Sequence, residues 1–326
     1  MRVSLPRSED GRNGGRKIRD FRHWVERTGT TGYHPGMGPL VRIPSRGNAV
    51  GQSSTGGSKG SFRDSASAPA VPKQRSAHAP TCLRMVAYNF LAGGSAKRAG
   101  QWSRVVRGLG ADIVFGQECR PPDACPGVSF RVRAGEAIAW VAARPPRWGT
   151  GLLVRGARLR GISVPEFDGW VVGGEVTGDG WPAPLLVFSV HGPAGERGYV
   201  KTMHEIVDRL VRIRGGADLV LGGDFNVVTG YRDACDPRTM SRGERELLDR
   251  MGAELELLPA WQTANPGRRL AQTLRWVSNP ATPYHCDGVF IPRAWRTRLL
   301  SCRVVRGRRW DALSDHSPVV AELVRP

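Results

Sequence analysis

Polar residues of the kinds that bind metal ions or move protons recur at the edges of apolar runs in this chain. They are Asn89, Glu118, His191, Asp224, Asn226, Asp287, Asp315 and His316. Carboxylates such as Glu118 and Asp315 are hard oxygen ligands suited to Mg²⁺ or Mn²⁺. The two histidines can exchange protons near neutral pH. This combination predicts metal-assisted hydrolysis of a phosphoester.

The remaining members of this set have complementary chemistry. The amides of Asn89 and Asn226 can bind a phosphate oxygen or orient a metal-bound water. A carboxylate such as Asp287 can hold an imidazole in one tautomer. The chain has no Walker loop, no dinucleotide-binding glycine fingerprint and no HExxH segment, which removes sequence support for kinase-like, dehydrogenase-like and zinc-protease functions.

Four of these polar positions lie at or just beyond the ends of predicted buried strands. The strands are expected at 82–90, 112–118, 185–191 and 218–221, and the polar ends are Asn89, Glu118, His191 and Asp224. In α/β sheets ligands gather beyond the strand ends, where side chains converge without being buried unpaired. The pattern therefore predicts one shared site.

The other predicted elements alternate between strand and helix. Apolar residues at helical spacing predict one helix that follows Ser95 and carries Trp102 to Leu109, and a second that carries Met203 to Leu210. Further strands are expected at 137–143, 151–154, 170–176, 289–291, 299–305 and 319–323. The expected fold class is α/β.

Charge favours a polyanionic partner. The 326-residue chain has 48 Lys or Arg against 29 Asp or Glu, a formal net charge of +19. Such an excess favours nucleic acid or phosphorylated ligands, although the arginine bias of a GC-rich genome would also produce it. The mean hydropathy is -0.33. The sequence contains no run of about 18 apolar residues, so no membrane-spanning helix is predicted.

Residues 1–80 differ in amino-acid composition from the rest of the chain. They carry 14 Lys or Arg against 5 Asp or Glu and are rich in Gly, Ser and Pro. This composition predicts a disordered basic tail ahead of one domain at 81–326. There are three alternatives for this segment: an arm that binds nucleic acid, a linker, or residues included because the translation start was assigned too far upstream. Without a signal-peptide pattern, and with six cysteines in no zinc spacing, we expect a cytoplasmic monomer.

Two segments carry a family resemblance. They are Gly223-Asp224-Phe225-Asn226 and Ser314-Asp315-His316-Ser317-Pro318-Val319. With Asn89, Gln117-Glu118, Ser189-Val190-His191 and Asp287, their order and spacing resemble the endonuclease/exonuclease/phosphatase superfamily across residues 81–326. The resemblance implies a four-layer α/β sandwich with two packed mixed sheets and helices outside.

The resemblance also implies a role for each position. Glu118 would bind the metal, with Asn89 beside it and Asp315 as a further carboxylate near the ion. Asp224 and Asn226 would position the attacking water and the phosphate. His316 would be the catalytic histidine, oriented by Asp287, while His191 would contact the phosphate or the leaving oxygen. Asp224 and His316 are both candidates for the general base.

The substrate stays open at this level. Leu91 departs from some abasic-site enzymes of this family, Cys286 from its repair nucleases, and Gly288 from the aromatic residue that many members have there. These departures weaken a DNA-repair assignment. A Mg²⁺- or Mn²⁺-dependent nuclease is the first prediction. The alternatives are a phosphatase or phosphodiesterase for small phosphorylated or lipid substrates, and a catalytically silent nucleic-acid-binding protein. Arg303, Arg306, Arg308, Arg309 and Trp310 are candidates for contacts with a nucleic-acid backbone.

The predicted tail can be tested by deletion. Removing residues 1–80 should leave the melting temperature nearly unchanged, because a disordered segment contributes no packing. If the tail also binds nucleic acid, its loss should flatten the salt dependence of binding, since fewer counterions are released. A large fall in melting temperature would instead mean that the tail packs on the domain.

Overall fold

The computed structural model describes residues 82–91, 100–122, 130–144, 148–178, 180–233, 236, 239–276 and 282–325. The predicted tail at 1–80 lies outside this range. Two six-stranded mixed sheets form the centre of the domain. No helix in the described part of the chain is long and apolar enough to cross a membrane.

The first sheet has the strand order β11-β12-β1-β2-β4-β3. Its strands are β1 (Cys82–Asn89), β2 (Ile113–Cys119), β3 (Glu136–Arg144), β4 (Trp148–Arg155), β11 (Leu299–Val304) and β12 (Val319–Val324). The second sheet has the order β5-β6-β7-β8-β10-β9. Its strands are β5 (Arg158–Ile162), β6 (Val171–Thr177), β7 (Leu185–His191), β8 (Leu219–Asp224), β9 (Leu257–Pro259) and β10 (Asp287–Pro292).

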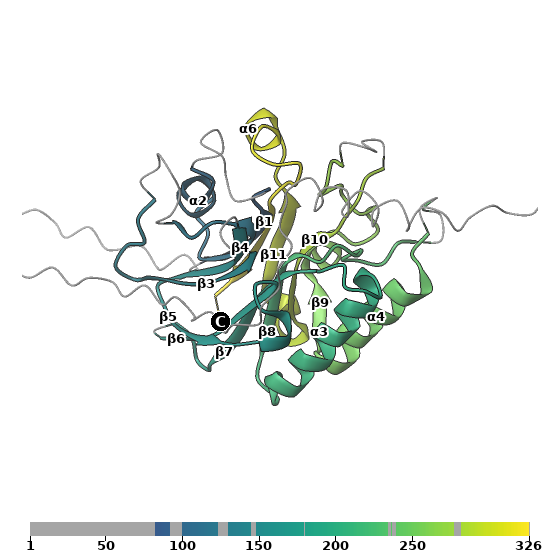
Figure 1. Ribbon diagram of the computed structural model, residues 1–326, viewed down its shortest axis with the longest axis horizontal. Coiled ribbons are helices and arrows are strands. Elements are labelled where there is room, and N and C mark those ends of the chain that lie inside the picture. The colour runs from purple at the N-terminus through teal and green to yellow at the C-terminus, as the bar shows by residue number, and fades with distance from the viewer. Residues whose placement is uncertain are drawn as a thin grey trace, which may run out of the picture.

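Helices cover the outer faces of both sheets (Figure 1). The long helices α3 (Tyr199–Arg214) and α4 (Arg242–Glu254) lie on the second sheet, and α2 (Gln101–Ser103) continues as the π-helix Arg104–Gly108 against the first sheet. The short helices are α5 (Ala260–Ala264) and α6 (Arg308–Asp311). Single turns of 3₁₀-helix occur at Pro165–Phe167 and Arg293–Arg298.

Three apolar clusters hold these layers together. Strand side chains alternate between faces, so Met85 of β1 packs between the sheets while Val86 packs outward against Trp102. The inter-sheet cluster also contains Phe115 and Val187. A third cluster joins α3 and α4 to the second sheet. The predicted four-layer α/β sandwich is therefore confirmed.

A few elements of the structure differ from those predicted from the sequence. The predicted helix after Ser95 is described only from Gln101, and its second part is a π-helix in which Leu109 N donates to Arg104 O at 2.9 Å. The sequence analysis missed β5, β9, α4 and the short helices α5 and α6. The start of α4 was readable, because Ser241 and Glu244 form a reciprocal capping box.

A glycine at the sheet interface gives a test of this packing. A Cβ on Gly222 would lie 2.2 Å from a ring atom of Phe115 on the facing sheet. Gly222→Ala should therefore destabilise the fold by about 1–3 kcal/mol through overpacking, as measured by denaturant unfolding. Gly108→Ala is the matched control, because its Cβ would meet nothing within 4 Å; an equal loss in both variants would contradict the packing argument.

Candidate active site

The strand register brings the predicted site residues to one edge of the sandwich. Strands β1 and β2 are parallel and pair Asn89 with Gln117, next to Glu118. Strands β7 and β8 are also parallel and pair His191 with Asp224. Since parallel strands end at the same edge, each sheet delivers two polar ends there.

Two antiparallel strands begin where these strands end. Strand β10 starts at Asp287, which is paired with Asp224 at the end of β8. Strand β12 starts at Val319, which is paired with Ala87 near the end of β1. The preceding Asp315 and His316 therefore lie beyond the end of β1, and Ser314 Oγ donates to Asn89 O at 2.8 Å.

The amide of Asn89 joins the two sheets at this edge. Its Nδ2 donates to Glu118 Oε1 at 3.2 Å and to Asp224 Oδ2 at 3.1 Å. Its Oδ1 accepts a hydrogen bond from Leu91 N at 2.9 Å. His191 Nε2 lies 3.9 Å from Glu118 Oε1. Asn89 thus fixes the distance between the carboxylates of the two sheets.

Asn226 is fixed by its own backbone and by the neighbouring loop. Its N–H donates to Asp224 Oδ1 at 3.0 Å, and its Nδ2 donates to Gly192 O at 3.0 Å. Both Asn226 and Glu118 have positive φ angles, of 54° and 46°. Non-glycine residues rarely adopt such angles, and when they do they concentrate at functional sites.

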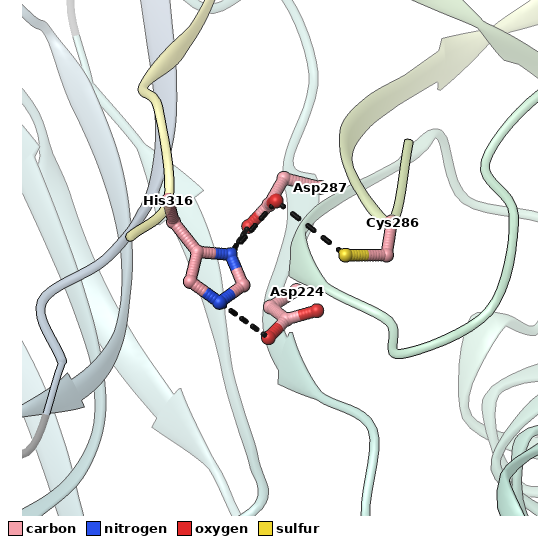
Figure 2. A group of neighbouring side chains, drawn as sticks. All are labelled: Asp224, Cys286, Asp287 and His316. Carbon is pink, nitrogen blue, oxygen red and sulfur yellow. Dashed lines mark hydrogen bonds and ion pairs between the residues drawn. The ribbon is translucent and has the colours of Figure 1, made fainter. Parts of the chain in front are cut away.

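His316 and Asp287 make the contact that the resemblance implied. His316 Nδ1 lies 2.9 and 3.0 Å from the two carboxylate oxygens of Asp287 (Figure 2). His316 Nε2 faces Asp224 Oδ2 at 3.8 Å. The exposed fractions of Asp224, Asp287 and His316 are 2%, 0% and 6%. One buried imidazole thus lies between two buried carboxylates.

This arrangement sets the protonation of the group. Burial by itself lowers the pKa of His316, but the charges of Asp287 and Asp224 and the Asp287 hydrogen bond raise that pKa to about 10. Burial by itself raises the pKa of Asp224, but the charges of His316 and His191 outweigh it and lower the pKa overall. At neutral pH the geometry therefore favours an imidazolium next to an ionised Asp224.

The donor set suits a hard cation on the Glu118 side of this edge. Asp315 Oδ1 is buried and has no hydrogen-bond partner among the described residues. It lies 3.9 Å from His316 Nε2, beyond hydrogen-bond distance. A buried carboxylate oxygen without a donor is costly unless a cation or water satisfies it. Asp315 and Glu118 both offer the type of oxygen ligand that Mg²⁺ or Mn²⁺ prefers.

The sequence analysis missed the residues that hold the two loops in place. Thr273 Oγ1 accepts hydrogen bonds from the backbone N–H groups of Cys286 and Asp287, both at 3.1 Å. Arg275 donates to Ser317 Oγ at 2.5 Å and to Ser314 O at 2.7 Å. The segment that carries His316 is therefore tied to the segment that carries Asp287. No local pattern indicates this, because the contacts join separate segments.

A second missed contact joins the sheets below the site. Gln117 Nε2 in β2 donates to Ser189 Oγ in β7 at 3.0 Å, and both side chains are fully buried. Both residues stand beside predicted site residues in the motifs Gln117-Glu118 and Ser189-Val190-His191. A polar residue inside each of two otherwise apolar strands, next to a predicted site residue, was the sequence signal for this contact between the sheets.

The predicted phosphate-contacting arginines are exposed. Arg303, Arg306, Arg308 and Arg309 all lie at the surface, on or beside β11 and α6, just ahead of the loop that carries Asp315 and His316. Trp310 is half-buried and its ring meets Tyr88 edge-on, with centroids 5.5 Å apart. Part of the predicted stacking surface is thus used in packing.

Comparison with known proteins identifies the fold through solved structures alone. No family model and no curated protein matches the chain by sequence. An AP endonuclease from Archaeoglobus fulgidus matches it with a TM-score of 0.56 and 14% identity over 73% of this chain and 98% of that one. The chain has the endonuclease/exonuclease/phosphatase fold.

Two further structures agree with this fold. An endonuclease/exonuclease/phosphatase from Bacteroides vulgatus has a TM-score of 0.54 and 17% identity, covering 76% of this chain and all 100% of that one. An AP endonuclease from Leishmania major has a TM-score of 0.54 and 14% identity, over 75% and 88% of the two chains. The resemblance drawn from the sequence motifs is thereby confirmed for the endonuclease/exonuclease/phosphatase fold.

The His316–Asp287 contact generates a test by double mutation. His316→Ala should lower turnover by about 10² to 10⁴-fold, the range typical of losing a catalytic hydrogen-bond or proton donor. Asp287→Asn should cost less alone, and almost nothing further in the His316→Ala background, because residues that act as a unit are non-additive. The measurement is steady-state hydrolysis by the four proteins of the cycle.

His204→Gln serves as the matched control for this cycle. His204 is half-buried on α3, where its Nδ1 lies 3.1 Å from a guanidinium nitrogen of Arg250. Turnover should therefore stay near that of the unmodified protein. If the effects of His316→Ala and Asp287→Asn multiply, Asp287 does not act through His316.

Proposed function

We propose that this chain is a divalent-metal-dependent phosphodiesterase that hydrolyses nucleic acid. The observation that carries the proposal is the buried imidazole of His316, which contacts Asp287 and faces Asp224 and Asp315 at 3.8 and 3.9 Å. Its Nε2 is thus directed at the carboxylates of Asp224 and Asp315. The endonuclease/exonuclease/phosphatase fold supports the same chemistry.

Glu118 and Asp315 would hold the metal ion, with Asn89 beside Glu118. When bound, Mg²⁺ or Mn²⁺ supplies positive charge that offsets the charge of the phosphate and polarises it. Glu118 is held for this purpose by the hydrogen bond from Asn89 Nδ2.

The protonation of the site supports Asp224 as the general base. With a pKa of about 10, His316 already carries protons on both ring nitrogens at neutral pH and cannot accept another. Asp224 is ionised there, because its pKa is lowered. Asp224 would take the proton of the attacking water, while His316 would donate a hydrogen bond to the phosphate.

Asn226 and His191 complete the proposed reaction. Asn226 is held next to Asp224 by its own backbone hydrogen bond and would orient the phosphate. The His191 ring packs against the rings of Trp148 and Trp170, with centroid distances of 5.4 and 5.0 Å, and its Nε2 lies 3.9 Å from Glu118 Oε1. From there it would contact the phosphate or the leaving oxygen.

Charge and position support nucleic acid as the substrate. The net charge of +19 favours a polyanion. The exposed arginines at 303, 306, 308 and 309 follow one another along the chain toward Asp315. A backbone of several phosphates could contact them while one phosphate occupies the site.

Metal dependence and substrate class can be measured together. The purified protein should cleave plasmid DNA, abasic duplex, single-stranded DNA or RNA with Mg²⁺ or Mn²⁺ and stop with EDTA. Glu118→Gln should lower the rate and raise the metal concentration needed for half-maximal rate, because one anionic oxygen is lost. Inositol phosphates and sphingomyelin are the comparison substrates.

Each alternative has its own outcome in this panel. Full hydrolysis in chelator would overturn the metal-dependent mechanism. Activity on inositol phosphates or sphingomyelin without cleavage of nucleic acid would overturn the substrate class. Binding of nucleic acid without hydrolysis of any substrate would identify a non-catalytic protein.

A further inference from the structure

A second set of metal-binding donors includes His316 itself. Asp224, Cys286, Asp287 and His316 each offer one ligand atom, and these atoms all lie within 4.8 Å of one another. All four residues are buried. Figure 2 shows their side chains directed toward one another from separate segments of the chain.

The chemistry of this set differs from that of the Glu118 side. It offers one sulfur, one imidazole nitrogen and two carboxylate oxygens, which match the four-coordinate, tetrahedral ligation that Zn²⁺ takes in proteins. Mg²⁺ prefers an octahedral shell of oxygens and retained waters. The two donor sets therefore select different ions, although they share one edge of the sandwich.

The backbone holds the thiol in this position before any ion arrives. Cys286 N and Asp287 N both donate to Thr273 Oγ1 at 3.1 Å. Cys286 O accepts a hydrogen bond from Phe225 N at 2.9 Å, directly after Asp224. Cys286 Sγ lies 3.7 Å from Asp287 Oδ2. Pre-organised ligands bind a metal with little loss of conformational freedom.

We propose that Asp224, Cys286, Asp287 and His316 form an inhibitory site for Zn²⁺. Binding replaces the thiol proton of Cys286 and the ring proton of His316, and both protons pass to solvent. Asp224 and His316 would then be ligands of the ion, so neither side chain would be available to the attacking water or the phosphate. Inhibition rests on the proposed phosphodiesterase function, whereas binding of the ion does not.

The spacing of the cysteines along the sequence gave no sign of this site. Cys286 has no cysteine or histidine ligand at a zinc-motif spacing, because its other ligands are the adjacent Asp287, Asp224 at the end of β8 and His316 in the loop before β12. The β8–β10 pairing and the Ser314–Ser317 loop bring them together only in the folded chain.

Binding is tested on the full chain without reference to activity. Co²⁺, which replaces Zn²⁺ in such sites, should give one equivalent of bound ion with a thiolate-to-cobalt charge-transfer band in the near ultraviolet. Zn²⁺ affinity is measured by competition with a chromophoric chelator. Cys286→Ser and Cys286→Ala should abolish the band and weaken Zn²⁺ binding by at least about 10- to 100-fold, the cost of losing even an outer-shell partner.

Two other cysteines provide matched controls. Cys302→Ser removes a buried thiol of the inter-sheet core, and Cys82→Ser removes an exposed one. Both variants should keep the band and the affinity. A Co²⁺ complex without the thiolate band, or equal weakening by Cys286→Ser and Cys302→Ser at unchanged melting temperature, would overturn the site.

Activity then tests inhibition separately. With Mg²⁺ and bis(p-nitrophenyl) phosphate or DNA as substrate, Zn²⁺ should inhibit, and Cys286→Ser should raise the half-inhibitory concentration by about tenfold or more relative to its own uninhibited rate. Cys286-dependent binding without hydrolysis of any substrate would overturn the proposed function alone. Hydrolysis that Zn²⁺ inhibits equally in the Cys286 variants would overturn the inhibitory site alone.

Discussion

Two buried carboxylates face each other across the pairing of β8 with β10, and the rest of the site is arranged around their charge. Asp224 and Asp287 are paired residues in the register, with exposed fractions of 2% and 0%. His316 lies between them as the compensating cation. Removing one partner of such a buried group costs about 3–5 kcal/mol. The same arrangement that offsets this cost places Nε2 of His316 3.8 Å from Asp224 Oδ2 and 3.9 Å from Asp315 Oδ1.

The sandwich makes that arrangement possible because both sheets deliver their strand ends to one edge. Each sheet has a parallel pair, β1–β2 or β7–β8, and the antiparallel partners β12 and β10 begin where these pairs end. Asn89 connects the two sheets at the surface of the core, and Gln117 with Ser189 connects them below it. The site is therefore rigid because it is built on strands, with Thr273 and Arg275 fixing the loops.

The two proposed donor sets would give the site two opposite responses to metal ions. Oxygen ligands on the Glu118 side favour a hard ion that supports hydrolysis. Sulfur and nitrogen ligands on the Cys286 side favour a thiophilic ion that would remove Asp224 and His316 from the reaction. Cys286 is also a position at which the chain departs from repair nucleases of the same family. The departure thus has a chemical consequence that can be measured.

The sequence by itself determined the fold class, most strands and the identity of the polar strand ends, because strand periodicity and short motifs such as Gly223-Asp224-Phe225-Asn226 are local. It also indicated the His316–Asp287 pairing, through its resemblance to a family. Only the tertiary structure decided that Asp224 faces the same imidazole, that Arg275 and Thr273 tie the loops together, and that Cys286 joins the cluster. These contacts join segments far apart in the chain. Their energies depend on burial and on neighbouring charge, which no local pattern of residues contains.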